Sequence, residues 1–384
     1  MRAAVADMFP ETNGRTGRWV KWVRRQLLGC LLLALPVVDA IGQDVIDPEA
    51  RTVVQASGFL DMYYGFDFNQ PASNTRPDFL FNHHRHNKIH ANLALLQLHL
   101  DQDRYRANLG VMGGTYAQRN LAHEPKLLRH VYAANMGVAL NQRSSLWLDV
   151  GVMPSHIGFE SAISADNPTL TRSLAAENSP YYLAGARLSW DASPNWQFAA
   201  LVVSGWQRIR PATGNSLPGV GTQVTYTLDA RFSLNWSTFI GTDDPDRNRR
   251  LRIFNNWYGT FQATDRLSLF AGFDMGMQQT AKGSSAYDVW FTPVVIARYR
   301  FADKWHLALR GEYYADPDGV IVAPETGQGF SVVGLSANID YAAFRHMLCR
   351  MEARWLGSND AVLPRREAMA RDSMAVIGSI AVRF

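Results

Sequence analysis

The chain has 384 residues, with 38 basic and 34 acidic side chains and a formal net charge of +4. Hydrophobic residues make up 47% of it and aromatic residues 11%, which is too apolar a composition for a disordered protein. No apolar run after the first 42 residues approaches the roughly 18 that a membrane-spanning helix needs, so helical membrane proteins are excluded.

Residues 1–42 have the features of a signal peptide. Basic residues from Arg18 to Arg25 precede an apolar run at 27–38, and Ala40-Ile41-Gly42 follows as a small-x-small cleavage site. The apolar run holds about a dozen residues, fewer than the roughly 20 of a spanning helix. We expect cleavage near Gly42, which leaves residues 43–384 as one mature domain.

The basic excess belongs mainly to this leader. It carries six of the 38 basic and three of the 34 acidic residues, which leaves 32 against 31 in the mature chain. A nearly neutral mature chain gives no reason to expect a nucleic-acid partner. Cys349 is then the only cysteine, so an internal disulfide is excluded.

The first mature segment, 53–68, alternates apolar and polar residues throughout, with Phe59 as the exception. Strict alternation predicts a strand with one apolar and one polar face. Its length exceeds the about 5 to 6 residues of most strands and suits a tilted strand that crosses a membrane.

A second strand is predicted at 88–100. Ile89, Ala91, Leu93 and Leu95 are predicted to face outward, and the apolar phase then shifts to Leu96. A β-bulge at the shift would keep one face apolar. The same alternation predicts fourteen more strands, at 104–117, 132–140, 146–152, 182–190, 196–202, around 224–226, 232–240, 251–262, 267–275, 287–301, 305–313, 331–341, 347–355 and 373–384.

Short and long connections alternate along these strands. Short turns lie at 101–103, 191–195 and 302–304. Aromatic residues bracket several of the short turns, as in Trp190 and Trp196, Phe301 and Trp305, and Tyr341 and Phe344, which is what an interfacial girdle would look like. The last strand ends on Phe384, and only a closed sheet would hold such an end without leaving an edge. We therefore predict an all-β, transmembrane, antiparallel up-and-down barrel of about 16 strands, with short periplasmic turns and long extracellular loops.

Four stretches carry a resemblance to a known family. They are Gly58-Phe-Leu-Asp-Met-Tyr-Tyr with Asn69-Gln-Pro, Gly151-Val-Met-Pro-Ser-His-Ile-Gly-Phe-Glu, Ala308-Leu-Arg-Gly-Glu-Tyr-Tyr-Ala-Asp-Pro-Asp-Gly, and Arg350-Met-Glu-Ala-Arg. With the terminal Phe384, the chain resembles the OmpL-like β-barrel porins over nearly all of its mature sequence. The resemblance implies a pore in the outer membrane and brings no defined binding residues.

Nine charged residues fall on the polar phase of their strands and are candidate pore-lining residues. In a barrel of this size they would select ions by charge or form a salt-bridge lattice that stiffens the wall. Seven are arginines, which favours anions modestly, and the insertion 154–178 is the candidate for an inward loop that narrows the pore. The nine are Arg187, Arg231, Arg298, Arg300, Arg310, Glu312, Arg350, Glu352 and Arg354.

Two clusters resemble metal sites. His83, His84, His86 and His90 lie in or beside the first long loop, where solvated histidines are the more common case. The acidic residues between Asp243 and Asp246 are interleaved with arginines that would compete with Ca²⁺ for the carboxylates. We predict no metal site, no cofactor and, without a Gly-x-Ser-x-Gly motif, no enzyme activity.

The function expected from these observations is passive diffusion of small polar or ionic solutes through a water-filled lumen in the outer membrane. The alternative is a receptor or adhesin whose extracellular loops bind a partner. Expected partners are outer-membrane lipid and lipopolysaccharide, the outer-membrane assembly machinery with Phe384 as its signal, the solutes, and further copies of the chain in a homo-oligomer.

Overall fold

The computed structural model describes residues 53–327 and 329–384. The predicted signal peptide and its cleavage site lie outside the described residues. Among the described residues, no helix is both long and apolar enough to cross a membrane.

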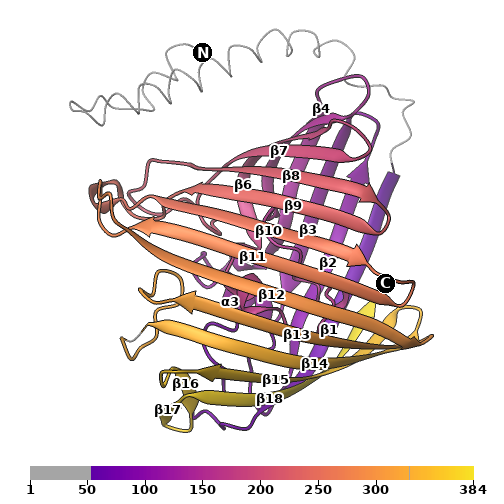
Figure 1. Cartoon of the computed structure of the whole chain (residues 1–384). Helices are drawn as coiled ribbons and strands as arrows, with labels where there is room; N and C mark the ends of the chain where they lie inside the picture. The colour runs from indigo at the N-terminus through magenta and orange to yellow at the C-terminus, as the bar shows by residue number, and fades with distance from the viewer. Residues whose placement is uncertain (1–52, 328) are drawn as a thin grey trace. The chain divides into compact units, whose positions relative to one another are not determined.

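Sixteen strands close into one antiparallel barrel (Figure 1), in which each strand pairs with its neighbours in sequence and the last pairs with the first. The predicted number of strands and the predicted closure are confirmed. The strands are β1 (Val53–Asp67), β2 (Ile89–Asp101), β3 (Tyr105–Gly113), β4 (Val131–Ala139), β5 (Leu146–Pro154), β6 (Tyr182–Asp191), β7 (Trp196–Val203), β8 (Gly219–Asp229), β9 (Phe232–Gly241), β10 (Arg252–Gln262), β11 (Leu267–Gln279), β12 (Tyr287–Ala302), β13 (Trp305–Asp316), β14 (Phe330–Phe344), β15 (Met347–Ser358) and β18 (Asp372–Arg383).

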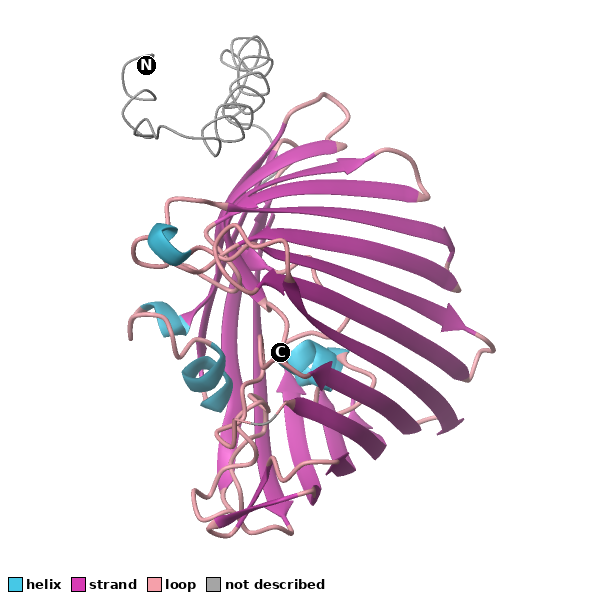
Figure 2. Ribbon diagram, turned by 60° about the vertical axis from the view of Figure 1, so that its left-hand side comes forward, coloured by secondary structure: helices cyan, strands magenta, loops and turns pink. Residues whose placement is uncertain are grey.

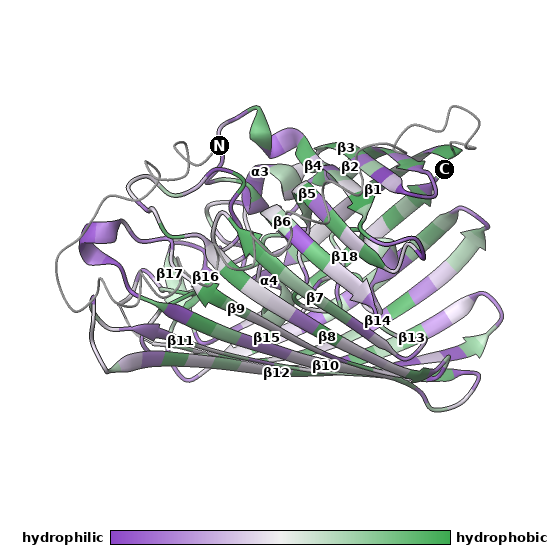
Figure 3. Ribbon diagram, turned by 90° about the horizontal axis from the view of Figure 1, so that it is seen from above, coloured by the Kyte–Doolittle hydropathy of each residue, from purple (hydrophilic) through white to green (hydrophobic). Residues whose placement is uncertain are grey.

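Alternating hydropathy gives the barrel its two faces (Figure 3). On β13, for example, Leu309 is 53% exposed on the outer face, whereas its neighbours Ala308 and Arg310 are buried inside. Exposed aromatic rings cluster beside the short turns, where Trp305 of β13 stacks on Tyr341 of β14 with ring centroids 4.5 Å apart. This is the arrangement of an interfacial girdle.

Short and long connections alternate as predicted. Short turns follow each even-numbered strand from β2 to β14 and join it to the next strand. The two described ends of the chain lie at the end of the barrel where these short turns are. The long connections carry the short helices α3 (Thr115–Asn120) and α4 (Leu174–Glu177), the 3-10 turns η1 (Leu128–His130), η2 (Ser164–Asp166) and η3 (Asp246–Asn248), and the hairpin of β16 (Leu363–Arg365) and β17 (Ala368–Ala370). The third strand is shorter than predicted because the chain turns into α3 after Gly113.

Phe384 closes the barrel against Gly58 of β1. The two residues exchange backbone hydrogen bonds of 2.7 and 3.0 Å. A Cβ atom added at Gly58 would lie 2.3 Å from the Phe384 ring, so the glycine leaves the space that the ring occupies. The terminal aromatic residue therefore packs across the seam of the closed sheet.

The bulge in β2 lies earlier than predicted. Its register with β1 shifts at Asn92, between the pairs Asp61–Leu93 and Met62–Ala91. Leu93 and Leu95 therefore face inward, 0% and 3% exposed, and the prediction that they face outward is wrong. They join Phe59, the apolar exception on the polar face of β1, in a cluster inside the barrel.

A second bulge reorients Tyr132, which the alternation placed outside. The register of β3 and β4 shifts between Gly110 and Val111. The Tyr132 ring packs over Gly110 and against the same inner cluster. A one-residue insertion reverses the side of every following residue, so sequence phase alone assigns these positions to the wrong face.

The lumen wall near the long loops is apolar. Inward-facing Phe239, Phe254 and Trp290 pack with Leu80 of the first long loop and Leu174 of α4. Figure 2 shows loop segments running inside the ring of strands. Loop side chains therefore cover apolar wall residues that would otherwise face water.

Candidate functional site

The candidate site is built by residues 155–181, here called the inner loop, which connects β5 to β6 and folds into the barrel as predicted. Its first part lies along β8 to β10. His156 Nε2 is 2.8 Å from the carbonyl oxygen of Thr238, and the Gly158 amide donates to Asn256 Oδ1 at 3.0 Å. Burial lowers the pKa of His156 to about 4, so the imidazole is neutral at pH 7.

The second part of the inner loop is held by arginines of the opposite wall. Arg310 donates to Glu352 at 2.8 Å and to the carbonyl oxygen of Thr171 at 2.5 Å. Arg354 donates to Glu312 at 2.7 Å and to the carbonyl oxygen of Arg172 at 3.1 Å. Each guanidinium thus joins a wall carboxylate to the loop backbone.

The wall carboxylates also hold the loop directly. Glu352 accepts the Thr171 amide at 2.6 Å, and Glu312 accepts the Leu174 amide at 2.6 Å. Charge-assisted hydrogen bonds of this kind are about twice as strong as neutral ones. The loop backbone therefore has a fixed position relative to β13 and β15.

Arg350 of β15 holds the deepest part of the loop. It donates to Asp340 at 2.7 and 3.0 Å, and to the carbonyl oxygens of Ser164 at 2.6 Å and Asn167 at 3.1 Å. Arg298 of β12 reaches the same Asp340 at 3.1 Å without a hydrogen bond to the inner loop.

The structure divides the nine candidate residues into groups. Arg310, Glu312, Arg350, Glu352 and Arg354 meet around the inner loop, and each of their side chains is 0% exposed. The other four lie apart: Arg298 is half-buried beside Asp340, Arg187 of β6 borders a cavity, and Arg231 and Arg300 are exposed near the short turns, where both contact Asp265.

Sequence reasoning missed the partners of these arginines. Asp340 and Asn338 lie on the polar phase of β14 and were available from the alternation. Thr169 and Thr171 gave no signal, because the inner loop has no periodicity and only its folded path brings its backbone to the wall. Inward carboxylates such as Asp340 offset part of the cationic excess predicted for the lumen.

A second long loop is tied to the inner loop. Glu177 of α4 accepts the backbone amides of Phe81 at 2.9 Å and Asn82 at 3.3 Å. Within the inner loop, Glu160 accepts the Ser173 amide at 3.1 Å, and burial raises the pKa of its carboxyl group. The two loops therefore form one hydrogen-bonded unit inside the barrel.

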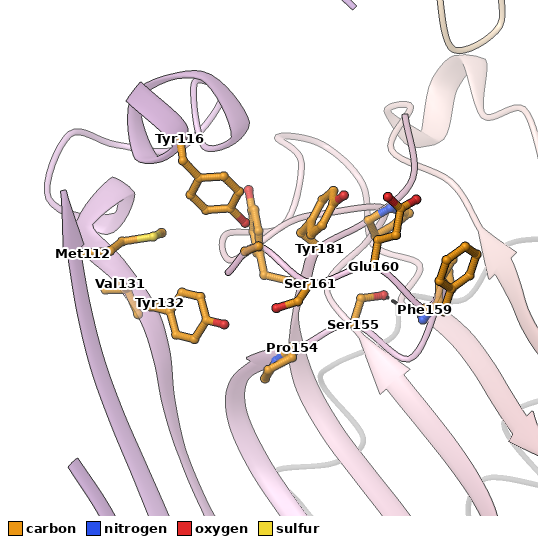
Figure 4. Close-up of a pocket in the computed structure, with 15 residues that line it drawn as sticks. Met112, Tyr116, Val131, Tyr132, Pro154, Ser155, Phe159, Glu160, Ser161 and Tyr181 are labelled. Carbon is orange, nitrogen blue, oxygen red and sulfur yellow. Dashed lines mark hydrogen bonds between the residues drawn. The ribbon is translucent and has the colours of Figure 1, made fainter. Parts of the chain in front are cut away.

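A cavity of about 240 Å³ lies between the inner loop and the β3–β6 wall. Figure 4 shows the side chains of Tyr132, Tyr181, Phe159 and Glu160 around it. The Arg172 guanidinium covers the Tyr181 ring at 3.0 Å. Aromatic faces and one carboxylate give this cavity a mixed apolar and acidic lining.

The histidines of the first long loop are buried, so the prediction that they are solvated is wrong. His83, His84 and His86 are at most 5% exposed. His83 Nε2 contacts Asp61 at 2.9 Å, and His86 Nδ1 accepts the Asp67 amide at 2.9 Å. Burial lowers the pKa of His84 to about 3, so the His84 imidazole is neutral at pH 7.

Neither predicted cluster assembles a metal site in the part of the chain that the structure describes. The acidic residues near β9 pair with arginines, as their interleaving indicated: Asp244 with Arg250 at 2.8 Å and Asp246 with Arg249 at 2.6 Å.

A serine, a histidine and an aspartate meet at Asp61. Asp61 contacts His83 and also accepts the Ser164 hydroxyl at 2.8 Å. In a hydrolase triad the serine hydrogen-bonds the histidine, whereas here Ser164 hydrogen-bonds the aspartate.

A closed sixteen-strand barrel with an apolar outer belt, short turns at one end and a loop folded inside defines an outer-membrane channel protein. A family model described as "Putative beta-barrel porin-2, OmpL-like" matches residues 53–384. The chain belongs to this porin family, so it lies in the outer membrane, and its short turns are periplasmic and its long loops extracellular. No curated protein sequence matches the chain.

Solved structures with a similar fold are porins and channels. An anion-selective porin from Comamonas acidovorans has a TM-score of 0.61 at 8% identity, covering 87% of this chain and 100% of that one. The outer-membrane channel DcaP of Acinetobacter baumannii has a TM-score of 0.58 at 12% identity, covering 87% and 97%. Salmonella typhi OmpF, in complex with daunomycin, has a TM-score of 0.56 at 12% identity, covering 86% and 97%.

Proposed function

We propose that the barrel passes small polar and ionic solutes passively across the outer membrane and that the inner loop sets the size of the path. The observation that carries this proposal is the network of Arg310, Arg350 and Arg354, which fixes a long loop inside a sixteen-strand barrel. A barrel of about 16 strands is wide enough for an aqueous channel unless the interior is filled.

In this proposal the three buried arginines position the loop, and the filter lies elsewhere. Their guanidinium groups are neutralised by Glu312, Glu352 and Asp340 and have no exposed side-chain surface. A passing ion senses a charge strongly only at close range, because salt screens it within about 8 Å. The charges that a passing ion can approach therefore include Arg187 and the 30% exposed Arg298 rather than these three arginines.

In this proposal the barrel catalyses no reaction and assembles with further copies of itself into a homo-oligomer. Its outer belt contacts lipid and lipopolysaccharide. The outer-membrane assembly machinery inserts it and recognises Phe384. The alternative function, a receptor or adhesin, uses the same barrel as an anchor for extracellular loops. Loops that pack into the lumen, as the inner loop and the first long loop do, favour the channel.

Purified full-length mature protein in a planar lipid bilayer tests the proposal. We expect stepwise conductance increments in KCl that persist without any added partner. A second measurement follows the swelling of proteoliposomes in a series of sugars of increasing size, which reports the width of the path. Absence of both conductance and swelling from correctly folded barrels would contradict the channel and favour the receptor.

A further inference from the structure

A cavity of about 330 Å³ opens in the lumen wall at the periplasmic half of the barrel. Inward-facing residues of β3 and of β5 to β8 line it, and most of their groups are polar. The lining includes Arg106, Trp147, Arg187, Ser189, Asp191 and Gln223.

Arg106 is committed to a partner. It donates to both carboxylate oxygens of Asp149, at 2.8 and 2.6 Å, and its guanidinium lies 4.3 Å from the centre of the Trp147 ring. Asp149 stands directly opposite Arg187 across the β5–β6 pair. Both Asp149 oxygens bind Arg106, and no hydrogen bond or ion pair joins Asp149 to Arg187 among the described residues.

Arg187 forms no ion pair with any described residue, whereas Arg298, Arg310, Arg350 and Arg354 each form at least one. Its Nη2 donates to Gln223 Oε1 at 3.2 Å, and its Nε is buried without a partner. No hydrogen bond joins its Nη1 to a described residue, and Arg187 lines the cavity.

We propose that Arg187 and this cavity form a binding subsite for a small oxyanion, a carboxylate or a phosphate, on the path through the barrel. The inference rests on the proposed channel function and adds a class of solute to it. Guanidinium groups bind such anions through charge-assisted hydrogen bonds. Arg106 and Asp149 neutralise each other, which leaves Arg187 as the positive and Asp191 as the negative group at the cavity, and the Arg187 guanidinium is the group that would hold the anion.

Asp191 limits the affinity of the subsite. It lies on the same face of β6, two alternating positions closer to the periplasmic turn, and also borders the cavity. Its negative charge opposes an anion at Arg187. A weak, rapidly exchanging site is what a channel needs, because a bound solute must also leave.

The test uses single channels of the full barrel in KCl at pH 7, with inorganic phosphate or succinate added as separate probes. Each probe should reduce the current in a saturable way. The variant Arg187→Gln should raise the half-blocking concentration by about fivefold, the value of one exposed ionic contact. Asp191→Asn should lower it by about twofold, because it removes a repulsive charge from a side chain that makes no hydrogen bond to the described residues.

Arg231→Gln is the matched control, since Arg231 is exposed near a periplasmic turn and pairs with Asp265 outside the cavity. It should leave the half-blocking concentration unchanged. Block by phosphate alone would restrict the subsite to phosphate, and block by succinate alone to carboxylates. Equal block of wild type and Arg187→Gln by both probes would overturn the proposal.

Isothermal titration calorimetry of the detergent-solubilised barrel with the same probes separates this inference from the proposed function. Binding that depends on Arg187 in a protein without conductance would refute the channel and keep the subsite. Conductance without Arg187-dependent binding would refute the subsite and keep the channel.

Discussion

Replacing Arg350 with Gln tests whether the buried arginines hold the inner loop. The change removes the ion pair with Asp340 and the hydrogen bonds to the carbonyl oxygens of Ser164 and Asn167. The ion pair joins two wall strands, so the loop-docking equilibrium changes only through the lost hydrogen bonds to the loop carbonyl oxygens. A hydrogen bond from a charged donor contributes about 1.5 to 3 kcal/mol. Losing two therefore costs about 3 kcal/mol or more, which is roughly a hundredfold in the docking equilibrium.

Single-channel recording in a planar bilayer is the assay. We expect Arg350→Gln to increase the conductance and the current noise, because the loop leaves its docked position for part of the time. Ion selectivity should change little, since the guanidinium has no exposed surface. The thermal unfolding temperature of the barrel should change little, because the hydrogen bonds between the sixteen strands stay intact.

Arg298→Gln is the matched control. Arg298 contacts the same carboxylate at 3.1 Å but is 30% exposed and has no hydrogen bond to the inner loop. It should leave conductance unchanged. If Arg350→Gln shifts the zero-current potential towards cations at unchanged conductance, Arg350 is part of the filter and the positioning role is wrong.

Three further predictions concern assembly, the lipid face and pH. Deleting Phe384 removes the ring that packs over Gly58, so the variant should be depleted from the outer membrane in cell fractionation; normal levels would show that the terminal ring is dispensable. Leu309→Arg, midway between the aromatic residues at the two ends of β13, should cost about 2 to 4 kcal/mol in lipid-refolding titrations, whereas Ser189→Arg, facing the cavity, should cost much less. His156 has a pKa of about 4 in the docked loop and 6.5 when free. Between these two pH values the undocked state binds more protons than the docked state. Docking is therefore strongest above pH 6.5 and weakens as the pH falls towards 4. Conductance should therefore rise on acidification in wild type, and a His156→Gln channel with the same pH response would assign the effect to another group.

The strand pattern was accessible from the sequence because a membrane strand has two different solvents. Lipid outside and the lumen inside impose a period of two on every strand, and the positions from Val53 to Phe384 carry it. Closure followed as well, since a terminal strand that ends on Phe384 needs a partner edge. The alternation assigned residues to the wrong face of the sheet where one extra residue enters a strand, at Asn92 and at Tyr132. Inward apolar residues at these bulges were predicted to face lipid.

Only the tertiary structure decided what the charged residues do. Alternation placed Arg187 and Arg350 on the same inner face, so the sequence predicted the same pore-lining role for both. The path of the inner loop distinguishes them, because its carbonyl groups reach Arg350 and leave Arg187 beside a cavity. That path has no local periodic signal: it is set by contacts between residues more than a hundred positions apart, such as Thr171 with Glu352, which form only when the barrel has closed around them.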